Sequence, residues 1–207
     1  MPNLIPTRKQ ISVRIVYVGP GVGGKTTNLR QIHQQFPEFR MAELATEGDR
    51  TLGGDFLPVA VGAESIDGWE LKVSLSSVPG QIQYAESRAS VLKNADVLVF
   101  VADSHLLRKD ANLHAFHDVR ALLEAEGRDP AQVPIVFQFN KSDLPGATSA
   151  ADLQATLNQG GAPAVEGAVA KDGVGVFETL GEALTLGIEE ARRYLKQALP
   201  ARSTAAA

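Results

Sequence analysis

The chain has 207 residues, of which 44% are hydrophobic and 21% charged, with a formal net charge of −4 and no cysteine. This length and composition fit one ordinary globular domain with its own hydrophobic core. The lack of cysteine excludes disulfides, cysteinyl zinc sites, a cysteine nucleophile and lipid-modified cysteines. The acidic balance argues against a strongly basic nucleic-acid binder, and the apolar runs are too short for a membrane span or a signal peptide. We therefore expect a soluble cytoplasmic protein with no nucleic-acid partner and no direct membrane anchor.

Buried strands and helices alternate along the chain. Continuous apolar runs rich in β-branched residues are typical of strands buried on both faces, and they occur at 11–18, 97–102 and 135–139. Apolar residues at helical spacing predict helices over 26–36, 112–126 and 178–199. This alternation predicts an α/β fold, in which a mainly parallel sheet is covered by helices on both faces.

One pair of predicted strands interrupts the alternation. The segments 57–61 and 71–75 have no helix between them, and Asp67-Gly68 is a turn signal. We expect an antiparallel hairpin here, which makes the sheet mixed. We interpret residues 1–10 as a loose N-terminal lead-in, 11–199 as a single domain and 200–207 as a disordered tail.

The segment 19–26 matches the phosphate-binding pattern G-x-x-x-x-G-K-[ST] between a predicted strand and a predicted helix. Glycines let successive backbone N–H groups approach phosphate oxygens, and the helix N-terminus adds a positive partial charge. The lysine places a cation near the β- and γ-phosphates, and Thr26 is the expected Mg²⁺ ligand. A chance match is the alternative, and the flanking strand and helix argue against it. The residues expected to bind the nucleotide here are Gly21, Val22, Gly23, Gly24, Lys25, Thr26 and Thr27.

Directly after the third buried strand, Asn140-Lys141-Ser142-Asp143 fits N-K-x-D, the guanine-reading motif of GTPases. The Asp143 carboxylate can accept from the guanine N1–H and exocyclic amine, whereas adenine would leave it unpaired. Asn140 can bond to the base edge and to the phosphate-binding loop, and the Lys141 stem can cover the base or ribose. The alternative is a polar loop that only caps a strand. Ligands of open α/β sheets bind at the carboxyl ends of the strands, which favours the nucleotide interpretation.

A last strand around 165–171 is expected to end beside this motif. Ala170 is the candidate whose backbone N–H donates to the guanine oxygen. The alternative is an ordinary strand end without a role in binding.

With these motifs in order, the chain resembles the Ras-like small GTPases, and more narrowly the MglA-type bacterial branch of gliding motility and cell polarity. The resemblance extends from about residue 11 to residue 195. It implies a P-loop switch that binds GTP or GDP with Mg²⁺ and hydrolyses GTP slowly. Further matching segments are 45–47, 49–52, 55–58, 78–81 and 175–180.

The resemblance also implies roles for four residues of two switch segments. Thr51 corresponds to the threonine that joins the Mg²⁺ ligands when GTP is bound, and Gly80 to the glycine whose N–H meets the γ-phosphate. Gln81 corresponds to the residue that orients the attacking water. Arg50 corresponds to an arginine that neutralises charge on the transferring phosphoryl group in cis. The bland alternatives are an exposed loop arginine, a polar residue without a chemical role and an ordinary loop threonine.

Two departures from the family pattern matter. Ser77 stands where most GTPases have an aspartate that supports Mg²⁺, although MglA-type proteins also lack that aspartate. Gly53-Gly54 stands where the MglA branch has a bulky aromatic pair. Because glycine loses more entropy when it is fixed, we expect a first switch that is less ordered in any one state and an altered partner contact.

Three functions are compatible with these features. The first is a regulatory GTPase with turnover of about 10⁻² s⁻¹ or below, stimulated by the roadblock-type activating homodimer that the resemblance implies, and acting in cell polarity or motility. The second is a guanine-nucleotide-binding scaffold that does not hydrolyse GTP. The third is a phosphotransferase acting on a small molecule, which N-K-x-D and the lack of a lid segment disfavour.

Overall fold

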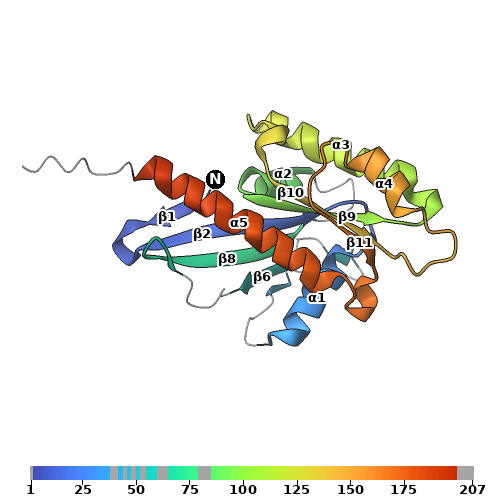
Figure 1. Cartoon of the computed structure of the whole chain (residues 1–207), viewed down its shortest axis with the longest axis horizontal. Helices are drawn as coiled ribbons and strands as arrows, with labels where there is room; N and C mark the ends of the chain where they lie inside the picture. Colours follow the sequence, from blue (N-terminus) through green and yellow to red (C-terminus); the bar gives the residue numbers. More distant parts are fainter. Residues whose placement is uncertain are drawn as a thin grey trace, which may run out of the picture.

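The computed structural model describes residues 2–37, 42–43, 46–47, 50–51, 55–59, 65–78 and 85–199, with side chains left out over the strands between 42 and 65 and over 85–88. Figure 1 shows a twisted sheet with helices on both sides. Its strands are β1 Asn3–Ile5, β2 Gln10–Val18, β3 Ala42–Glu43, β4 Thr46–Glu47, β5 Arg50–Thr51, β6 Asp55–Val59, β7 Ser65–Ile66, β8 Trp69–Ser77, β9 Val97–Asp103, β10 Ile135–Asn140 and β11 Ala164–Ala168. Its α-helices are α1 Lys25–Gln35, α2 Ala85–Lys93, α3 Lys109–Ala125, α4 Ala150–Leu157 and α5 Val176–Ala198. Short 3₁₀ helices are η1 Pro6–Arg8, η3 Leu106–Arg108, η4 Pro130–Gln132 and η5 Ala170–Asp172.

The sheet is mixed and mainly parallel, as the sequence predicts. In the described part of the chain its strand order is β11-β10-β9-β2-β8-β6-β3. The run from β11 to β8 is parallel, whereas β6 is antiparallel to β8 and β3 to β6. The strand order reverses at β2, between β9 on one side and β8 on the other, and the carboxyl edge at such a point is where open α/β sheets bind ligands.

The buried strands and long helices of the sequence analysis are confirmed. β2, β9 and β10 cover the three apolar runs, and α1, α3 and α5 cover the three predicted helices. Two shorter helices are additional. The Ser149 side chain caps α4 by accepting from the Asp152 N–H at 3.1 Å, a Ser-x-x-acidic signal that is legible in the sequence. α2 carries few apolar residues, so its apolar spacing does not predict it.

The expected antiparallel pairing is also confirmed, with one difference in connection. β6 pairs with β8, from Phe56 opposite Ser76 to Val59 opposite Val73. The Asp67-Gly68 turn joins β8 to β7 rather than directly to β6. Both turn residues have positive φ, 51° and 82°, as a type I′ hairpin turn requires. Residues 60 and 61 of the predicted strand lie outside the described residues.

The expectation of a loose lead-in is wrong for residues 3–5. β1 pairs antiparallel with β2, with Leu4 opposite Ile11. The pairing has a physical reason, because β9 pairs with β2 only from Ile15 onward and the preceding part of that edge needs hydrogen-bond partners. The division of the chain at residue 11 stays a prediction, and the predicted tail 200–207 lies outside the described residues.

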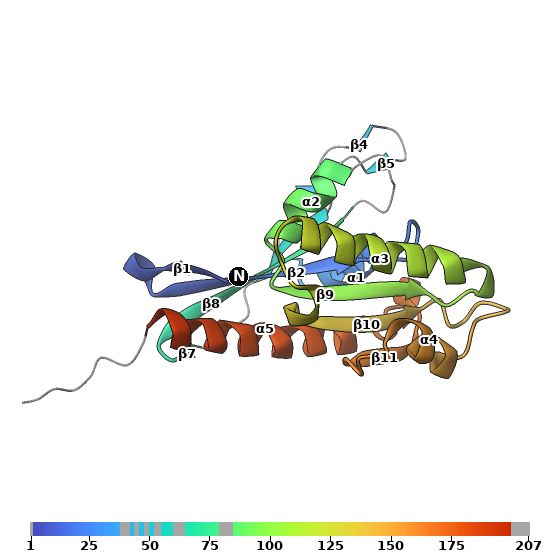
Figure 2. The same cartoon turned by 90° about the horizontal axis from the view of Figure 1, so that it is seen from above.

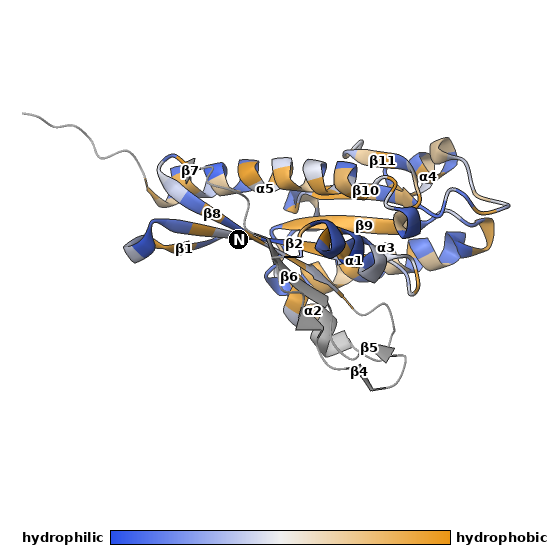
Figure 3. Cartoon of the chain, turned by 90° about the horizontal axis from the view of Figure 1, so that it is seen from below, coloured by the Kyte–Doolittle hydropathy of each residue, from blue (hydrophilic) through white to orange (hydrophobic). Residues whose placement is uncertain are grey.

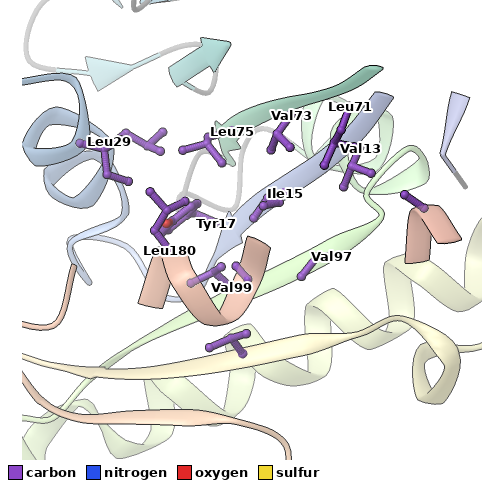
Figure 4. Packing of buried hydrophobic residues seen from close by; sticks show 14 of the residues in the cluster. Val13, Ile15, Tyr17, Leu29, Leu71, Val73, Leu75, Val97, Val99 and Leu180 are labelled. Carbon is purple, nitrogen blue, oxygen red and sulfur yellow. The ribbon is translucent and has the colours of Figure 1, made fainter. Parts of the chain in front are cut away.

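Two hydrophobic layers lie on opposite faces of the sheet, as Figure 2 shows with α5 on one side and α3 on the other. Because successive strand residues point to opposite faces, Tyr17 belongs to the layer under α1 and α5, whereas Val16 belongs to the layer under α2, α3 and α4. Figure 4 shows the first layer, where Tyr17 lies beside Leu180 of α5. Figure 3 shows the hydrophobic colouring along β9 between the helices. Burial of both faces fixes the positions of the strand ends that carry the site.

Gly187 marks the closest approach of α5 to the sheet. It is buried, and a Cβ added there would lie 3.1 Å from Val13 Cγ1. The helix can therefore lie this close to β2 and β9 only with a small residue at this position.

We expect Gly187→Leu to lower the free energy of unfolding by about 1–3 kcal/mol, because the larger side chain overpacks the α5–β2 contact. Urea denaturation at unchanged m-value measures the loss. Gly181→Leu is the matched control, since Gly181 is an exposed residue of the same helix and no described atom lies within 4 Å of its added Cβ. It should leave stability unchanged or raise it, as leucine favours helix over glycine. Equal losses in the two variants would contradict this account.

Candidate nucleotide-binding site

The phosphate-binding loop runs from the carboxyl end of β2 to the first turn of α1. Gly24 is the residue before the helix, with φ of 111°, and Lys25 is its first residue. Val22 has φ of 55°, a left-handed conformation that is costly for a β-branched side chain, and it is 83% exposed. The loop therefore holds a strained backbone at a solvent-exposed position, which is typical of functional sites.

Close packing against neighbouring elements explains two of the loop glycines. A Cβ on Gly19 would collide with the Val101 carbonyl oxygen of β9, and one on Gly24 would collide with Asn140 Nδ2. The sequence analysis ascribed the glycines to phosphate approach. The structure adds that Gly19 and Gly24 also let the loop lie directly against β9 and the N-K-x-D segment.

Lys25 is 6% exposed, and its ammonium donates to the loop itself. Its Nζ donates to Gly19 O at 3.0 Å and to Pro20 O at 2.7 Å. A buried cation requires such acceptors, and these bonds hold the charge against the loop. Thr26 and Thr27 follow in the first turn of α1 and are half-buried.

Asn140 links the loop to the last strand. Its Nδ2 donates to Gly23 O at 2.8 Å, which is the expected bond to the phosphate-binding loop. Its Oδ1 accepts from the Ala170 N–H, also at 2.8 Å. The Ala170 N–H thus has a partner within the protein, so a guanine oxygen would have to share or replace that bond. The proposed role of Ala170 stays a prediction.

Asp143 and Lys171 form an ion pair of 2.9 Å. The hydrogen bond from Lys171 holds the pKa of the Asp143 carboxyl below its usual range. In turn, the Asp172 and Asp143 carboxylates raise the pKa of Lys171. Asp143 is therefore ionised at neutral pH and only accepts hydrogen bonds, as guanine recognition requires.

The two motifs share one cavity of about 290 Å³. It opens between the phosphate-binding loop, the end of β10 and η5. Most of the predicted binding residues therefore meet here, although they are far apart in the sequence. The lining residues are Val22, Gly24, Thr27, Asn140, Lys141, Asp143, Leu144, Val169, Ala170 and Lys171.

The switch residues are placed only in part. Arg50 and Thr51 form β5, which pairs antiparallel with β4, and only their backbone is described. Gly80 and Gln81 lie outside the described residues, as do Gly53 and Gly54. Their proposed roles stay predictions.

Ser77 ends β8 beside Tyr17 of β2 and is 3% exposed. A hydroxyl group thus occupies this buried position, where most GTPases have the carboxylate of an aspartate.

The sequence analysis gave no role to a buried polar network beneath the loop. Gln138 of β10 donates to Asn28 Oδ1 at 2.9 Å and to Thr179 Oγ1 at 2.8 Å. Asn28 donates to Gly24 O at 3.0 Å and to Gln138 Oε1 at 2.7 Å. The network joins β10, α1 and α5 under the phosphate-binding loop. Its signal in the sequence is the single glutamine inside the apolar run 135–139.

A second network holds Lys141, and the sequence analysis did not predict it. Lys141 Nζ pairs with the buried Asp103 at 2.7 Å. Asp103 directly follows the apolar run 97–102, where a carboxylate is out of pattern. The bond orients Lys141, whose φ of 66° is left-handed, at the mouth of the cavity.

Comparison with known proteins supports the class that this fold and loop define, a small GTPase. Residues 4–197 match the model of the ADP-ribosylation factor family. The chain is 40% identical over 188 residues to the mutual gliding-motility protein MglA of Myxococcus xanthus, covering 89% of this chain and 95% of that protein. It is 24% identical over 200 residues to the Ras-related protein Rab7 of Pisum sativum, covering 92% and 91%.

A solved structure shows the same fold. The Arl6 BBS3 small GTPase of Trypanosoma brucei, with the bound nucleotide analogue GppNp, superposes with a TM-score of 0.62 at 22% identity, covering 86% of this chain and 99% of that one. The chain therefore belongs to the Ras-like small GTPases, and within them to the MglA-type branch. Both the resemblance and the fold class predicted from the sequence are confirmed. No helix in the described ranges combines the length and apolarity needed to cross a membrane.

Replacing Gln138 should test the polar network. We expect Gln138→Leu to lower the free energy of unfolding by about 1–3 kcal/mol, because it leaves buried groups of Asn28 and Thr179 without their partner. Gln132→Leu makes the same change at an exposed position in η4 and should have little effect. Urea denaturation compares the two. A loss no larger for Gln138→Leu than for the control would show that the network contributes nothing to stability.

Removing the Lys171 ammonium should raise the pKa of Asp143 toward the ordinary value of about 3.9, since the bond that stabilises the ionised carboxylate is lost. NMR titration of the Asp143 carboxyl carbon in Lys171→Ala measures the change. Lys72→Ala, which removes an exposed lysine paired with Glu70, should leave that titration unmoved. An unchanged Asp143 pKa in Lys171→Ala would contradict the assigned cause.

Proposed function

We propose that the chain is a guanine-nucleotide-dependent switch, which binds GTP and GDP with Mg²⁺ and hydrolyses GTP slowly. The observation that carries the proposal is the single cavity on which the phosphate-binding loop and the N-K-x-D motif converge. Family membership supports the coarser conclusion that the chain is a small GTPase of the GTP-binding switch type.

Each wall of the cavity has a separate role in this proposal. The loop amides from Gly21 to Thr27, the Lys25 ammonium and the N-terminus of α1 bind the phosphates. The ionised Asp143 accepts from the guanine N1–H and amine, and an adenine would leave it without a donor. Because leaving a buried acceptor unpaired is costly, this pair sets the base preference.

The residues present fit a Mg²⁺ ion held mainly by the nucleotide. Nucleotide-bound Mg²⁺ needs only one or two protein oxygens, with phosphates and waters as its other ligands. The Thr26 hydroxyl in the first turn of α1 supplies one, and we assign Thr51 as the second. The ion would neutralise charge on the β- and γ-phosphates when bound. Since Ser77 replaces a carboxylate, we expect this Mg²⁺ to be anchored more weakly than in most GTPases.

For hydrolysis we assign Gln81 to orient the attacking water and Arg50 to neutralise charge on the transferring phosphoryl group. Binding of the γ-phosphate orders the segments of Thr51 and Gly80, and hydrolysis releases them. A roadblock-type homodimer that presses Arg50 and Gln81 into position is the proposed activator. The name of the Myxococcus xanthus relative supports a role in motility or polarity. A cytoplasmic location stays a prediction.

A guanine-nucleotide-binding scaffold that does not hydrolyse GTP is the second candidate. The buried Ser77 favours it, because it removes a support for the metal ion. The phosphotransferase alternative has no observation of this kind in its favour.

We expect protein loaded with GTP and Mg²⁺ to convert it to GDP over hours, at about 10⁻² s⁻¹ or below, while an ATP-loaded control retains no nucleotide. Chromatography of the bound nucleotide follows the reaction. Arg50→Ala and Gln81→Leu should each slow it by about 100-fold or more without loss of GTP binding, whereas the exposed Arg8→Ala should match the unaltered protein. Equal retention of ATP would refute guanine recognition. Persistent GTP, with and without a roadblock-type dimer, would favour the scaffold.

A further inference from the structure

Arg108 reaches the phosphate-binding loop from a different part of the chain. It ends η3, which follows β9, and its Nη2 donates to Gly21 O at 2.8 Å. Its Nε lies 3.6 Å from Asp103 Oδ2, which is too long for a hydrogen bond. That Nε is buried and has no hydrogen-bond acceptor among the described residues. The loop carbonyl is therefore the hydrogen-bond partner that fixes this guanidinium.

A rigid base holds Arg108 in place. The Asp103 side chain is 3% exposed, accepts from Lys141 and accepts from the His105 N–H at 3.1 Å. Asn112 of α3 binds the Asp103 backbone on both sides, accepting from its N–H at 2.9 Å and donating to its carbonyl at 2.8 Å. Asp103 thus lies between the two cations, one directed to the base motif and one to the phosphate-binding loop.

The bond to Gly21 controls the direction of the next amide. A trans peptide is planar, so its C=O and N–H point in opposite directions. With the Gly21 carbonyl directed at Arg108, the Val22 N–H points to the other side of the loop. Val22 itself is left-handed and 83% exposed, so packing of its side chain does not hold this conformation. Arg108 on one side, and the bond from Gly23 N to Pro20 O of 3.2 Å on the other, do so.

We propose that Arg108 is a positioning residue for the nucleotide phosphates: it holds the Gly21–Val22 peptide so that the Val22 N–H faces the phosphates. The inference rests on the proposed function of the cavity. It separates two tasks of the Asp103 network, since Lys141 serves the base side and Arg108 the phosphate side.

The test compares Arg108→Gln with Arg120→Gln, which removes the same charge from an exposed residue of α3. Affinities for GDP and for guanosine are measured by competition with a fluorescent GDP analogue. Loss of a charge-assisted hydrogen bond should weaken GDP binding by about 10-fold in Arg108→Gln and leave guanosine binding unchanged. Arg108→Lys keeps a charged donor and should recover part of the loss. Thermal unfolding of each variant without nucleotide checks the fold.

The outcomes separate this inference from the proposed function. Selective loss of GDP affinity, with partial recovery in Arg108→Lys, supports it. Equal GDP affinities in the two glutamine variants refute it, as does an equal loss for GDP and guanosine, which indicates a general structural role. If the unaltered protein binds no GDP, the proposed function fails, and the inference that rests on it fails too.

Discussion

Asn140 makes the two hydrogen bonds on which the geometry of the site depends. One bond reaches Gly23 of the phosphate-binding loop and the other reaches Ala170 after the last strand. A single buried amide thus holds together segments that follow β2, β10 and β11. Gly24 must lack a side chain for this contact to form, because a Cβ there would collide with Asn140 Nδ2. The two motifs are therefore mechanically coupled, whatever ligand lies between them.

The supports of this coupling are polar and buried. Gln138 and its partners lie under the loop, and Asp103 with Asn112 lies under Lys141 and Arg108. Buried polar groups with satisfied hydrogen bonds favour one arrangement over its alternatives, which suits a site that must hold several backbone amides at once. Although the chain carries a net charge of −4, Lys25, Lys141, Lys171 and Arg108 gather around this region. Local charge, and not the overall balance, suits it for an anionic ligand.

The departures from the family pattern concern the side of the site toward the γ-phosphate. Ser77 is buried beside β2 and Gly53-Gly54 replaces a bulky pair. The loop, the base motif and their supports are intact by comparison. We infer that binding of a guanine nucleotide is the better supported part of the proposal. Hydrolysis and partner choice depend on residues whose side chains are not described.

The sequence by itself determined the α/β class, the loop, the base motif and the family, because these follow from short local patterns. Continuous apolar runs predict buried strands, and glycine spacing before a lysine predicts a phosphate loop within one stretch of chain. The β1 strand, the partner of the Ala170 N–H and the reach of Arg108 to Gly21 were decided only by the tertiary structure. Each depends on which edge, carbonyl or amide a distant segment leaves within hydrogen-bond distance once the strands are in register. No local pattern encodes that distance, since it is set by packing on both faces of the sheet.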